Sequence, residues 1–313
     1  MEEKILGLHH ITAIAGKAQR NYDFYTSVLG LRLVKKTVNF DDPETYHFYF
    51  GNERGDPGTI LTFFPWENVK QGKLGTGMAT EIGFSVPPES FDFWVDRFHK
   101  KNIRHELPIE KFDEMSMIFW DPDGLKIKLT APMHPDPRHV WRTAEIPGEN
   151  AIKGFHGVSL LLKDAGPTAL VLTDLLGYRL VKQDGNSYRY QCDAVETAAF
   201  VDLTESPDEK PGMVGGGTNH HVAFRVKNRE TQMFFHDKIL NHGLRITEQI
   251  DRNYFFSVYF REPGGVLFEI ATDNPGFTVD EPLNELGTHL KLPEQYEKER
   301  SYLEKKLSVL DQS

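Results

Sequence analysis

The sequence has a single cysteine, Cys192, among its 313 residues, so no disulfide can form within one chain. A chain without a disulfide framework suits a reducing compartment, and we interpret Cys192 as a small buried apolar side chain. No run approaches the about 18 consecutive apolar residues of a membrane-spanning helix. The N-terminal residues also lack the basic and apolar regions of a secretory signal peptide. Together these absences predict a cytoplasmic protein without a membrane span.

An excess of basic charge is also missing. The formal net charge is -10 at pH 7, which argues against nucleic acid or an anionic membrane as the partner. Hydrophobic residues make up 39% of the chain and charged residues 26%, as in ordinary soluble globular proteins. The length is enough for two domains that each bury a core.

The sequence contains an internal repeat, on which the predicted fold and the predicted site depend. Four segments of the first half recur in the second half. The pairs are 7–12 with 154–159, 29–35 with 176–182, 81–84 with 221–224 and 121–125 with 262–266. The halves are therefore duplicates, and each half holds two units.

Each unit has the pattern of a strand, an amphipathic helix and three further strands. In the first unit, residues 8–15 alternate as a strand, and residues 22–29 carry a helical apolar stripe that ends at Gly30. Three strand-like runs follow, at 32–38, 46–51 and 59–65. We place the four units at 7–66, 78–133, 153–205 and 218–273.

The fold class that this pattern predicts is α+β, with four βαβββ modules that form two paired-module barrels. The predicted domains are an N-terminal pair of modules at 7–133, a linker at 134–152, a C-terminal pair of modules at 153–273 and an extension with a charged helix at 274–313.

Four such modules resemble the vicinal oxygen chelate superfamily, the group of glyoxalase I and the extradiol dioxygenases. The resemblance covers roughly residues 7–273, and its most specific part is the opening segment 7–34. It implies that the sheets of two modules curl around a shared cavity. It also implies that metal ligands come from the first and last strands of the modules.

Strand alternation then selects between the two adjacent histidines of the first module. His9 shares its face with Ile11 and Ala13, an apolar set, whereas His10 shares its face with Thr12. The more polar face should line the cavity. We therefore predict His10 as the ligand and expect His9 on the face away from the metal.

The fourth module repeats this arrangement. His220 lies with Val222 on the apolar face, and His221 lies on the more polar face. In the last strand, Glu269 points away from the apolar face that contains Phe268. His221 and Glu269 are therefore the candidate ligands of this module.

The matching positions of the other modules do not retain this set. They are occupied by Glu81, Lys128, Gly157 and Asp202, and the glutamate position of module one falls close to Phe63. Modules one and four should therefore face each other around a single metal ion held by His10, His221 and Glu269. Two imidazoles and one carboxylate leave about three positions open in an octahedron, as in the non-haem Fe(II) oxygenases. Zn²⁺ would need a fourth protein ligand or a water.

Within the superfamily, this ligand set resembles the hydroquinone ring-cleaving dioxygenases, a group that includes 2,6-dichlorohydroquinone 1,2-dioxygenase and a Bacillus-type ring-cleaving dioxygenase of methylhydroquinone resistance. The resemblance implies catalytic or substrate-binding roles for five further residues: His9, Thr12, His220, Arg252 and Tyr259. It implies an Fe(II)-dependent enzyme that opens 1,4-dihydroxybenzene rings with O₂, in aromatic catabolism or hydroquinone detoxification. His220 or His9 would be the general acid–base, and Arg252 and Tyr259 would hold the substrate oxygen.

Two other functions stay open. A glyoxalase-type isomerase or a thiol-conjugating metalloenzyme on the same fold would work with Ni²⁺, Zn²⁺ or Mn²⁺ and consume no O₂. A non-catalytic protein that binds an aromatic compound would need no metal ligands. The expected partner is in each case a small molecule, and the sequence allows a homo-oligomer without specifying one.

Eight histidines are expected to have ordinary structural or surface roles. They are His47, His99, His105, His134, His139, His236, His242 and His289.

Overall fold

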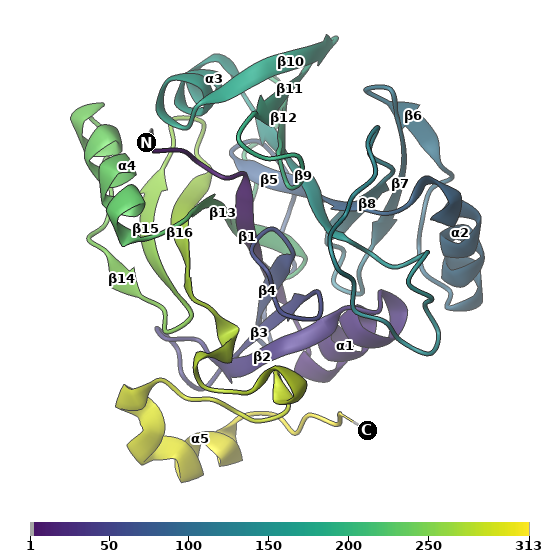
Figure 1. The fold of residues 1–313 in the computed structure, drawn as a ribbon, viewed down its shortest axis with the longest axis vertical. Helices are drawn as coiled ribbons and strands as arrows, with labels where there is room; N and C mark the ends of the chain where they lie inside the picture. Colours follow the sequence, from purple (N-terminus) through teal and green to yellow (C-terminus); the bar gives the residue numbers. More distant parts are fainter. Residues whose placement is uncertain (1–2, 313) are drawn as a thin grey trace.

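The structure, a computed structural model, describes residues 3–312 and consists of two curled eight-stranded sheets with short helices on their outer faces (Figure 1). It confirms the predicted α+β fold with four βαβββ modules. No helix within residues 3–312 is long and apolar enough to cross a bilayer.

The two N-terminal modules have the predicted element order. Module one comprises β1 (Leu8–Ala15), α1 (Ala18–Asp23), the π-helical turn η1 (Phe24–Val28), β2 (Arg32–Val38), β3 (Tyr46–Gly51) and β4 (Ile60–Pro65). Module two comprises β5 (Met78–Ser85), η2 (Pro88–Ser90), α2 (Phe91–Lys100), β6 (Ile109–Lys111), β7 (Glu114–Trp120) and β8 (Lys126–Thr130). The predicted strands of module one are confirmed to within one residue.

The C-terminal modules repeat that order. Module three comprises β9 (Gly154–Leu162), α3 (Gly166–Leu170), the π-helical turn η3 (Val171–Leu175), β10 (Tyr178–Asp184), β11 (Ser187–Cys192) and β12 (Phe200–Glu205). Module four comprises β13 (Thr218–Val226), α4 (Arg229–Asn241), β14 (Ile250–Asp251), β15 (Phe255–Arg261) and β16 (Leu267–Pro275).

Each sheet combines one module from each half of the chain. The first sheet has the order β14-β15-β16-β13-β1-β4-β3-β2, which joins module four to module one. The second has the order β10-β11-β12-β9-β5-β8-β7-β6, which joins module three to module two. The first strands of the two modules pair antiparallel at the centre of each sheet. The predicted domains, with one pair of modules in each half of the chain, stay a prediction.

Alternation along the strands explains how the helices are held. The outward faces of β1 and β4 carry Ile11 and Phe63, which are fully buried. Tyr25, from the helical segment of module one, stacks on Phe63 with a centroid distance of 4.5 Å. The segment ends at Gly30, whose φ of 69° is the left-handed conformation predicted for a helix stop. The opposite face of the sheet is left to line a cavity.

Two β-bulges interrupt the seam between β1 and β13, where the register shifts at two points. The extra residue is His9 on β1 and His220 on β13. A bulge breaks strict alternation and can direct two consecutive side chains to the same region.

The C-terminal extension packs beside β2 and β3 (Figure 1). Its 3₁₀ segments are η4 (Phe277–Val279), η5 (Leu283–Glu285) and η6 (Glu294–Glu299), and its helix is α5 (Arg300–Lys306). The hydroxyl of Tyr46 donates to the carbonyl of Ser308 at 3.0 Å, and that of Tyr296 donates to the carbonyl of Phe40 at 2.8 Å. The extension therefore supports the loop between β2 and β3.

Candidate metal centre

Three buried side chains from three strands converge on one point. Nε2 of His10 on β1 lies 3.3 Å from Nε2 of His221 on β13. Oε2 of Glu269 on β16 lies 3.2 Å from the first of these nitrogens and 2.9 Å from the second. Within residues 3–312 this is the one group of three such side chains close enough to share a metal ion. The structure thus brings together the three residues that alternation and the repeat selected.

The three donor atoms fit a divalent metal ion. Two ligands at right angles, each about 2.1 Å from an ion, are about 3 Å apart, and the three edges here are 2.9 to 3.3 Å. Oε2 of Glu269 is buried and has no hydrogen-bond partner of acceptable geometry, although two ring nitrogens are near it. A buried carboxylate oxygen without a hydrogen bond is costly. A cation at the shared point would satisfy all three atoms.

In each of the two strands, the histidine that precedes the candidate ligand contacts the ligand's second ring nitrogen, Nδ1. Nδ1 of His10 lies 2.9 Å from Nδ1 of His9, and Nδ1 of His221 lies 2.8 Å from Nδ1 of His220. For Nε2 to offer a lone pair to a metal, Nδ1 must carry the proton and donate it to its neighbour. His9 and His220 are therefore acceptors at Nδ1, and each carries its own proton on Nε2. The imidazole of His9 is further anchored by a hydrogen bond to the backbone of Thr272.

These contacts correct the expectation for His220, which lines the cavity, whereas His9 stays outside the cavity and still contacts Nδ1 of His10. The β-bulges turn both rings towards the ligands. Their surroundings nevertheless differ. His9 is only 2% exposed and packs between His10 and Phe255, whereas His220 lines the cavity.

The carboxylate of Glu269 is held in its ionised form. Burial alone would raise its pKa, but His10 and His221 hold the pKa of Glu269 well below its usual range. The hydroxyl of Ser257, on the neighbouring strand β15, donates to Oε1. This bond leaves Oε2 to face the two histidines.

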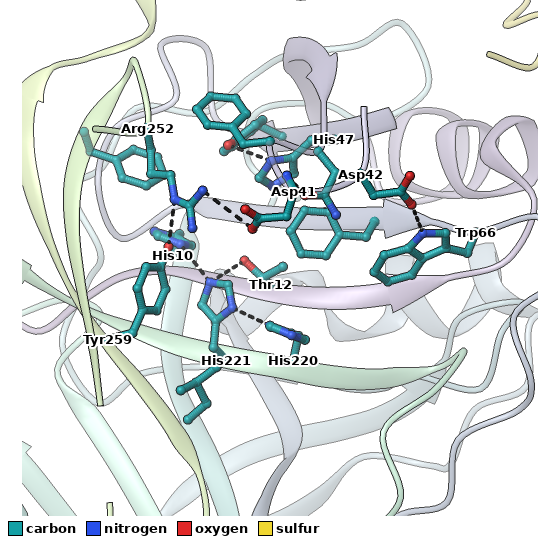
Figure 2. Close-up of a pocket in the computed structure, with 16 residues that line it drawn as sticks. His10, Thr12, Asp41, Asp42, His47, Trp66, His220, His221, Arg252 and Tyr259 are labelled. Atoms are coloured by element: carbon teal, nitrogen blue, oxygen red, sulfur yellow. Dashed lines mark hydrogen bonds and ion pairs between the residues drawn. The ribbon is translucent and has the colours of Figure 1, made fainter. Parts of the chain in front are cut away.

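A cavity of about 410 Å³ opens onto His10 and His221 (Figure 2). Thr12, Arg252 and Tyr259 line it, as the resemblance implied. Figure 2 shows Arg252 and Tyr259 together on one side, where Nε of Arg252 lies 3.3 Å from the Tyr259 hydroxyl. All predicted cavity residues except His9 therefore face one space above the triad.

The cavity also contains residues that the sequence analysis missed. They are Asn39, Phe40, Asp41, Asp42, His47, Tyr49, Phe64, Trp66, Phe255 and Leu267. His47, which was expected to have an ordinary structural or surface role, lies in the wall of this cavity. A signal was present, because His47 and Tyr49 alternate along β3 with Phe48 and Phe50, which belong to the core.

The strand register also corrects one matched position. Thr12 pairs with Thr62 in module one as Ala223 pairs with Glu269 in module four. The residue equivalent to Glu269 is therefore Thr62, whose Oγ1 lies 2.8 Å from that of Thr12, and not the neighbouring core residue Phe63. Whether Glu269 is matched with Phe63 or with Thr62, module one has no second carboxylate at this position.

The equivalent place in the second sheet is filled by ion pairs. Glu81 binds Lys128 at 2.9 Å and Lys126 at 3.0 Å. Arg189 binds Asp202 at 2.8 Å. These pairs neutralise one another, so the second sheet has no open set of ligands at this place among the residues that the structure describes.

Comparisons with known proteins identify the family of this chain. The family model of the Glyoxalase/Bleomycin resistance protein/Dioxygenase superfamily matches residues 7–129 and 154–270. A Bacillus subtilis (strain 168) protein named "Putative ring-cleaving dioxygenase MhqE" is 47% identical over 302 residues, which cover 96% of this chain and 97% of that protein. A Sphingobium indicum protein named "Chlorohydroquinone/hydroquinone 1,2-dioxygenase" is 34% identical over 305 residues, with 95% and 94% covered.

A solved structure has the same fold over its whole length. The crystal structure of a "putative dioxygenase from Bacillus subtilis subsp. subtilis str. 168" superposes with a TM-score of 0.95 and 44% identity, and the match covers 99% of both chains. These matches confirm the resemblance that the repeated modules and the opening segment indicated.

Proposed function

Because the chain belongs to the Glyoxalase/Bleomycin resistance protein/Dioxygenase superfamily, we propose that it is an Fe(II)-dependent dioxygenase that opens 1,4-dihydroxybenzene rings with O₂. The observation that carries the proposal is the donor set at the floor of the cavity: two imidazoles and one carboxylate, with the remaining sides open. A relative named as a chlorohydroquinone/hydroquinone dioxygenase supports the choice of substrate class.

The residues that would hold the metal are His10, His221 and Glu269. Ferrous iron bound there would supply a redox-active centre with adjacent open positions for a phenolic oxygen and for O₂. The protein's own task is then to orient the ring, to hold the protons and to stabilise negative charge on the substrate oxygen.

Arg252 and Tyr259 provide donors for that charge. Burial and the charge of Glu269 raise the pKa of Tyr259, so its hydroxyl stays protonated and can donate. The adjacent guanidinium of Arg252, which is partly buried, adds a positive charge. Donors preorganised around developing charge are worth most where water is excluded.

His220 provides an uncharged ring at the cavity wall. Burial, with His221 beside it, lowers the pKa of His220 from 6.5 to about 3, so the ring is neutral at pH 7. Because its Nδ1 accepts from His221, its Nε2 proton is the one available to a substrate. His220 therefore acts as a neutral donor in the proposed reaction, and His9 orients His10 from outside the cavity.

The charges around the cavity favour an uncharged ring. Asp41 and Asp42 line its entrance, and Arg252, the one lysine or arginine among the described lining residues, lies 3.8 Å from a carboxylate oxygen of Asp41. The wall beside them is aromatic, formed by Phe64 and Trp66. Alkyl or halogen substituents fit this environment, and a ring carboxylate would be repelled.

The test is O₂ uptake by protein loaded anaerobically with Fe(II), measured with methylhydroquinone, catechol and a carboxylated hydroquinone. We expect uptake that depends on Fe(II), with the highest kcat/KM for methylhydroquinone. A much higher kcat/KM for catechol would contradict the substrate class. Turnover of a thiol conjugate with Ni²⁺, Zn²⁺ or Mn²⁺ and without O₂ uptake would support the isomerase instead.

A further inference from the structure

A continuous chain of hydrogen bonds runs along the cavity wall from β3 to the metal centre. The hydroxyl of Tyr49 lies 2.9 Å from Nδ1 of His47, and Nε2 of His47 lies 3.0 Å from Oγ1 of Thr62. Oγ1 of Thr62 lies 2.8 Å from Oγ1 of Thr12, which lies 2.8 Å from Nε2 of His221. Five side chains are therefore connected in series (Figure 2 shows the end at Thr12 and the position of His47).

The end of the chain at His221 sets the direction of every bond in it. In the tautomer that leaves Nε2 of His221 free for a metal, Nδ1 donates to His220 and the lone pair of Nε2 accepts the proton of Thr12. The oxygen of Thr12 then accepts from Thr62, and the oxygen of Thr62 accepts the Nε2 proton of His47. Nδ1 of His47 is left as the acceptor for the Tyr49 hydroxyl. Bonds that all run in one direction polarise one another.

We propose that His47 is a positioning residue of the active site and that, supported by Tyr49, it directs the hydroxyl proton of Thr12 into the cavity. Thr62 already donates to Thr12, so Thr12 cannot turn its own proton back along the wall. Once the lone pair of His221 is engaged by a metal ion, the cavity is the direction left for the Thr12 proton. A donor aimed there stabilises charge on a bound phenolic oxygen. This role rests on the proposed function, whereas the order of the hydrogen bonds rests only on the tautomer of His221.

The surroundings of His47 suit this positioning role. Its ring centroid lies 4.1 Å from that of Tyr49 and 4.5 Å from that of Phe64, so the ring is held on two sides. Burial, together with the histidines of the metal centre, lowers the pKa of His47 well below its ordinary value. A neutral imidazole has one donor and one acceptor, which is what a one-way chain requires.

The second sheet shows that the fold itself does not require this chain. The strand register matches Thr62 with Asp202 and Tyr49 with Arg189. There the guanidinium of Arg189 binds both oxygens of Asp202, at 2.8 and 2.9 Å. A closed ion pair takes the place of the chain, so the chain accompanies the metal centre and is not a property of the βαβββ module.

The first test needs neither metal nor turnover. Imidazole nitrogen chemical shifts of the metal-free protein, labelled at histidine, report which nitrogen of each ring carries the proton, and loss of a signal in His47→Gln assigns His47. We expect the Nε2–H form of His47 in the wild type and a shifted Nδ1 signal in Tyr49→Phe. A proton on Nδ1 of wild-type His47 would overturn the chain, whatever the activity.

The second test compares turnover and metal content in matched variants. His47→Leu should lower kcat by about 10- to 100-fold with little change in KM or iron content, as is typical for partners of the residues around a metal. His47→Gln offers an amide N–H to Thr62 and should recover most of the loss. Tyr49→Phe should lower kcat by about 10-fold, and Tyr46→Phe is its control, because that hydroxyl on the same strand bonds Ser308 outside the cavity.

Equal kcat in Tyr49→Phe, His47→Leu and Tyr46→Phe would overturn the positioning role. If His47→Leu does not fold, His47→Gln and Tyr49→Phe carry the same test. A wild-type protein that cleaves no ring would refute the proposed function, and the tautomer measurement would separately decide whether the chain exists.

Discussion

Each of the three candidate metal ligands aims one atom at the shared point, and its other polar atom is hydrogen-bonded to a neighbour. Nδ1 of His10 and of His221 face the preceding histidines, and Oε1 of Glu269 accepts from Ser257. Replacing any one of the three ligands with alanine should abolish tight metal binding, because two remaining ligands hold an ion only weakly. Metal analysis of each variant after loading with Fe(II) measures this.

His156→Ala is the control for the metal analysis. His156 occupies the position of His9 in the second sheet and binds Glu114 at 2.9 Å, away from the triad. Its substitution should leave the metal content at the wild-type level. Full occupancy in all three alanine variants would show that the metal is held elsewhere.

Arg252 and Tyr259 should affect turnover without affecting the metal. Tyr259→Phe keeps the ring volume and removes only the hydroxyl, so the fold should change little. Loss of one donor aimed at developing charge costs about 10²–10³ in kcat, and we expect losses of that order for Tyr259→Phe and Arg252→Ala. The measurement is iron content and kcat on the same samples. Wild-type values of both in Tyr259→Phe would remove Tyr259 from the mechanism.

The convergence of the three candidate ligands could be predicted from the sequence, but much of their surroundings could not. Alternation within a strand and the comparison of four modules were enough to choose His10, His221 and Glu269. The tautomers of His9 and His220 depend on ring contacts that only the folded chain creates.

Among the structural elements, the β-bulges could not be predicted from the sequence. Alternation assumes an unbroken ladder, and it therefore placed His220 away from the cavity and did not indicate the contact between His9 and His10. A bulge arises from the pairing of two strands far apart in the sequence, and β1 and β13 are such a pair. The contribution of the loop between β2 and β3 to the cavity could not be predicted for the same reason, because its side chains reach the cavity only after β3 has paired.

The C-terminal extension should control the entrance of the cavity through that loop. Tyr296 donates to the carbonyl of Phe40, which lines the cavity. A hydrogen bond of this kind contributes about 1 kcal/mol, so Tyr296→Phe should make loop 39–45 more mobile and raise KM several-fold with kcat unchanged. Amide hydrogen exchange of the loop and steady-state kinetics measure both effects. Tyr188→Phe on β11 of the second sheet is the control, and equal exchange in the two variants would contradict the supporting role.

For the whole molecule, the sequence predicted the duplication. It predicted only in part which modules join to form each sheet. Matched segments predicted four modules, and the distribution of ligand types predicted that modules one and four share a site. Both expectations agree with the strand order. The ion pairs of the second sheet could not be predicted, because Glu81 and Lys128 come from module two and Asp202 from module three, and Lys128 meets Asp202 only across the central seam.

Those ion pairs should make the stability depend on pH. Burial would raise the pKa of Glu81, but Lys128 and Lys126 lower it from 4.5 to about 2. A lowered pKa stabilises the fold above the unfolded value and the gain is lost as the pH falls through the folded value. Glu81 should therefore contribute about 3 kcal/mol at pH 7 that disappears between pH 4.5 and about 2.

Denaturant unfolding of wild type and Glu81→Gln across that pH range measures the contribution of Glu81. The two free energies of unfolding should differ at pH 7 and converge as the pH approaches 2. A difference that stays constant with pH would show that the charge of Glu81 does not stabilise the second sheet.

In the proposed function, the triad supports insertion of oxygen from O₂ into a 1,4-dihydroxybenzene ring. The most direct measurement is mass spectrometry of the product formed from methylhydroquinone under isotopically labelled O₂ by Fe(II)-loaded protein. We expect a ring-opened acid that contains labelled oxygen, and no such product from Glu269→Ala. An unlabelled quinone as the sole product, or the same labelled product from Glu269→Ala, would contradict the proposed function.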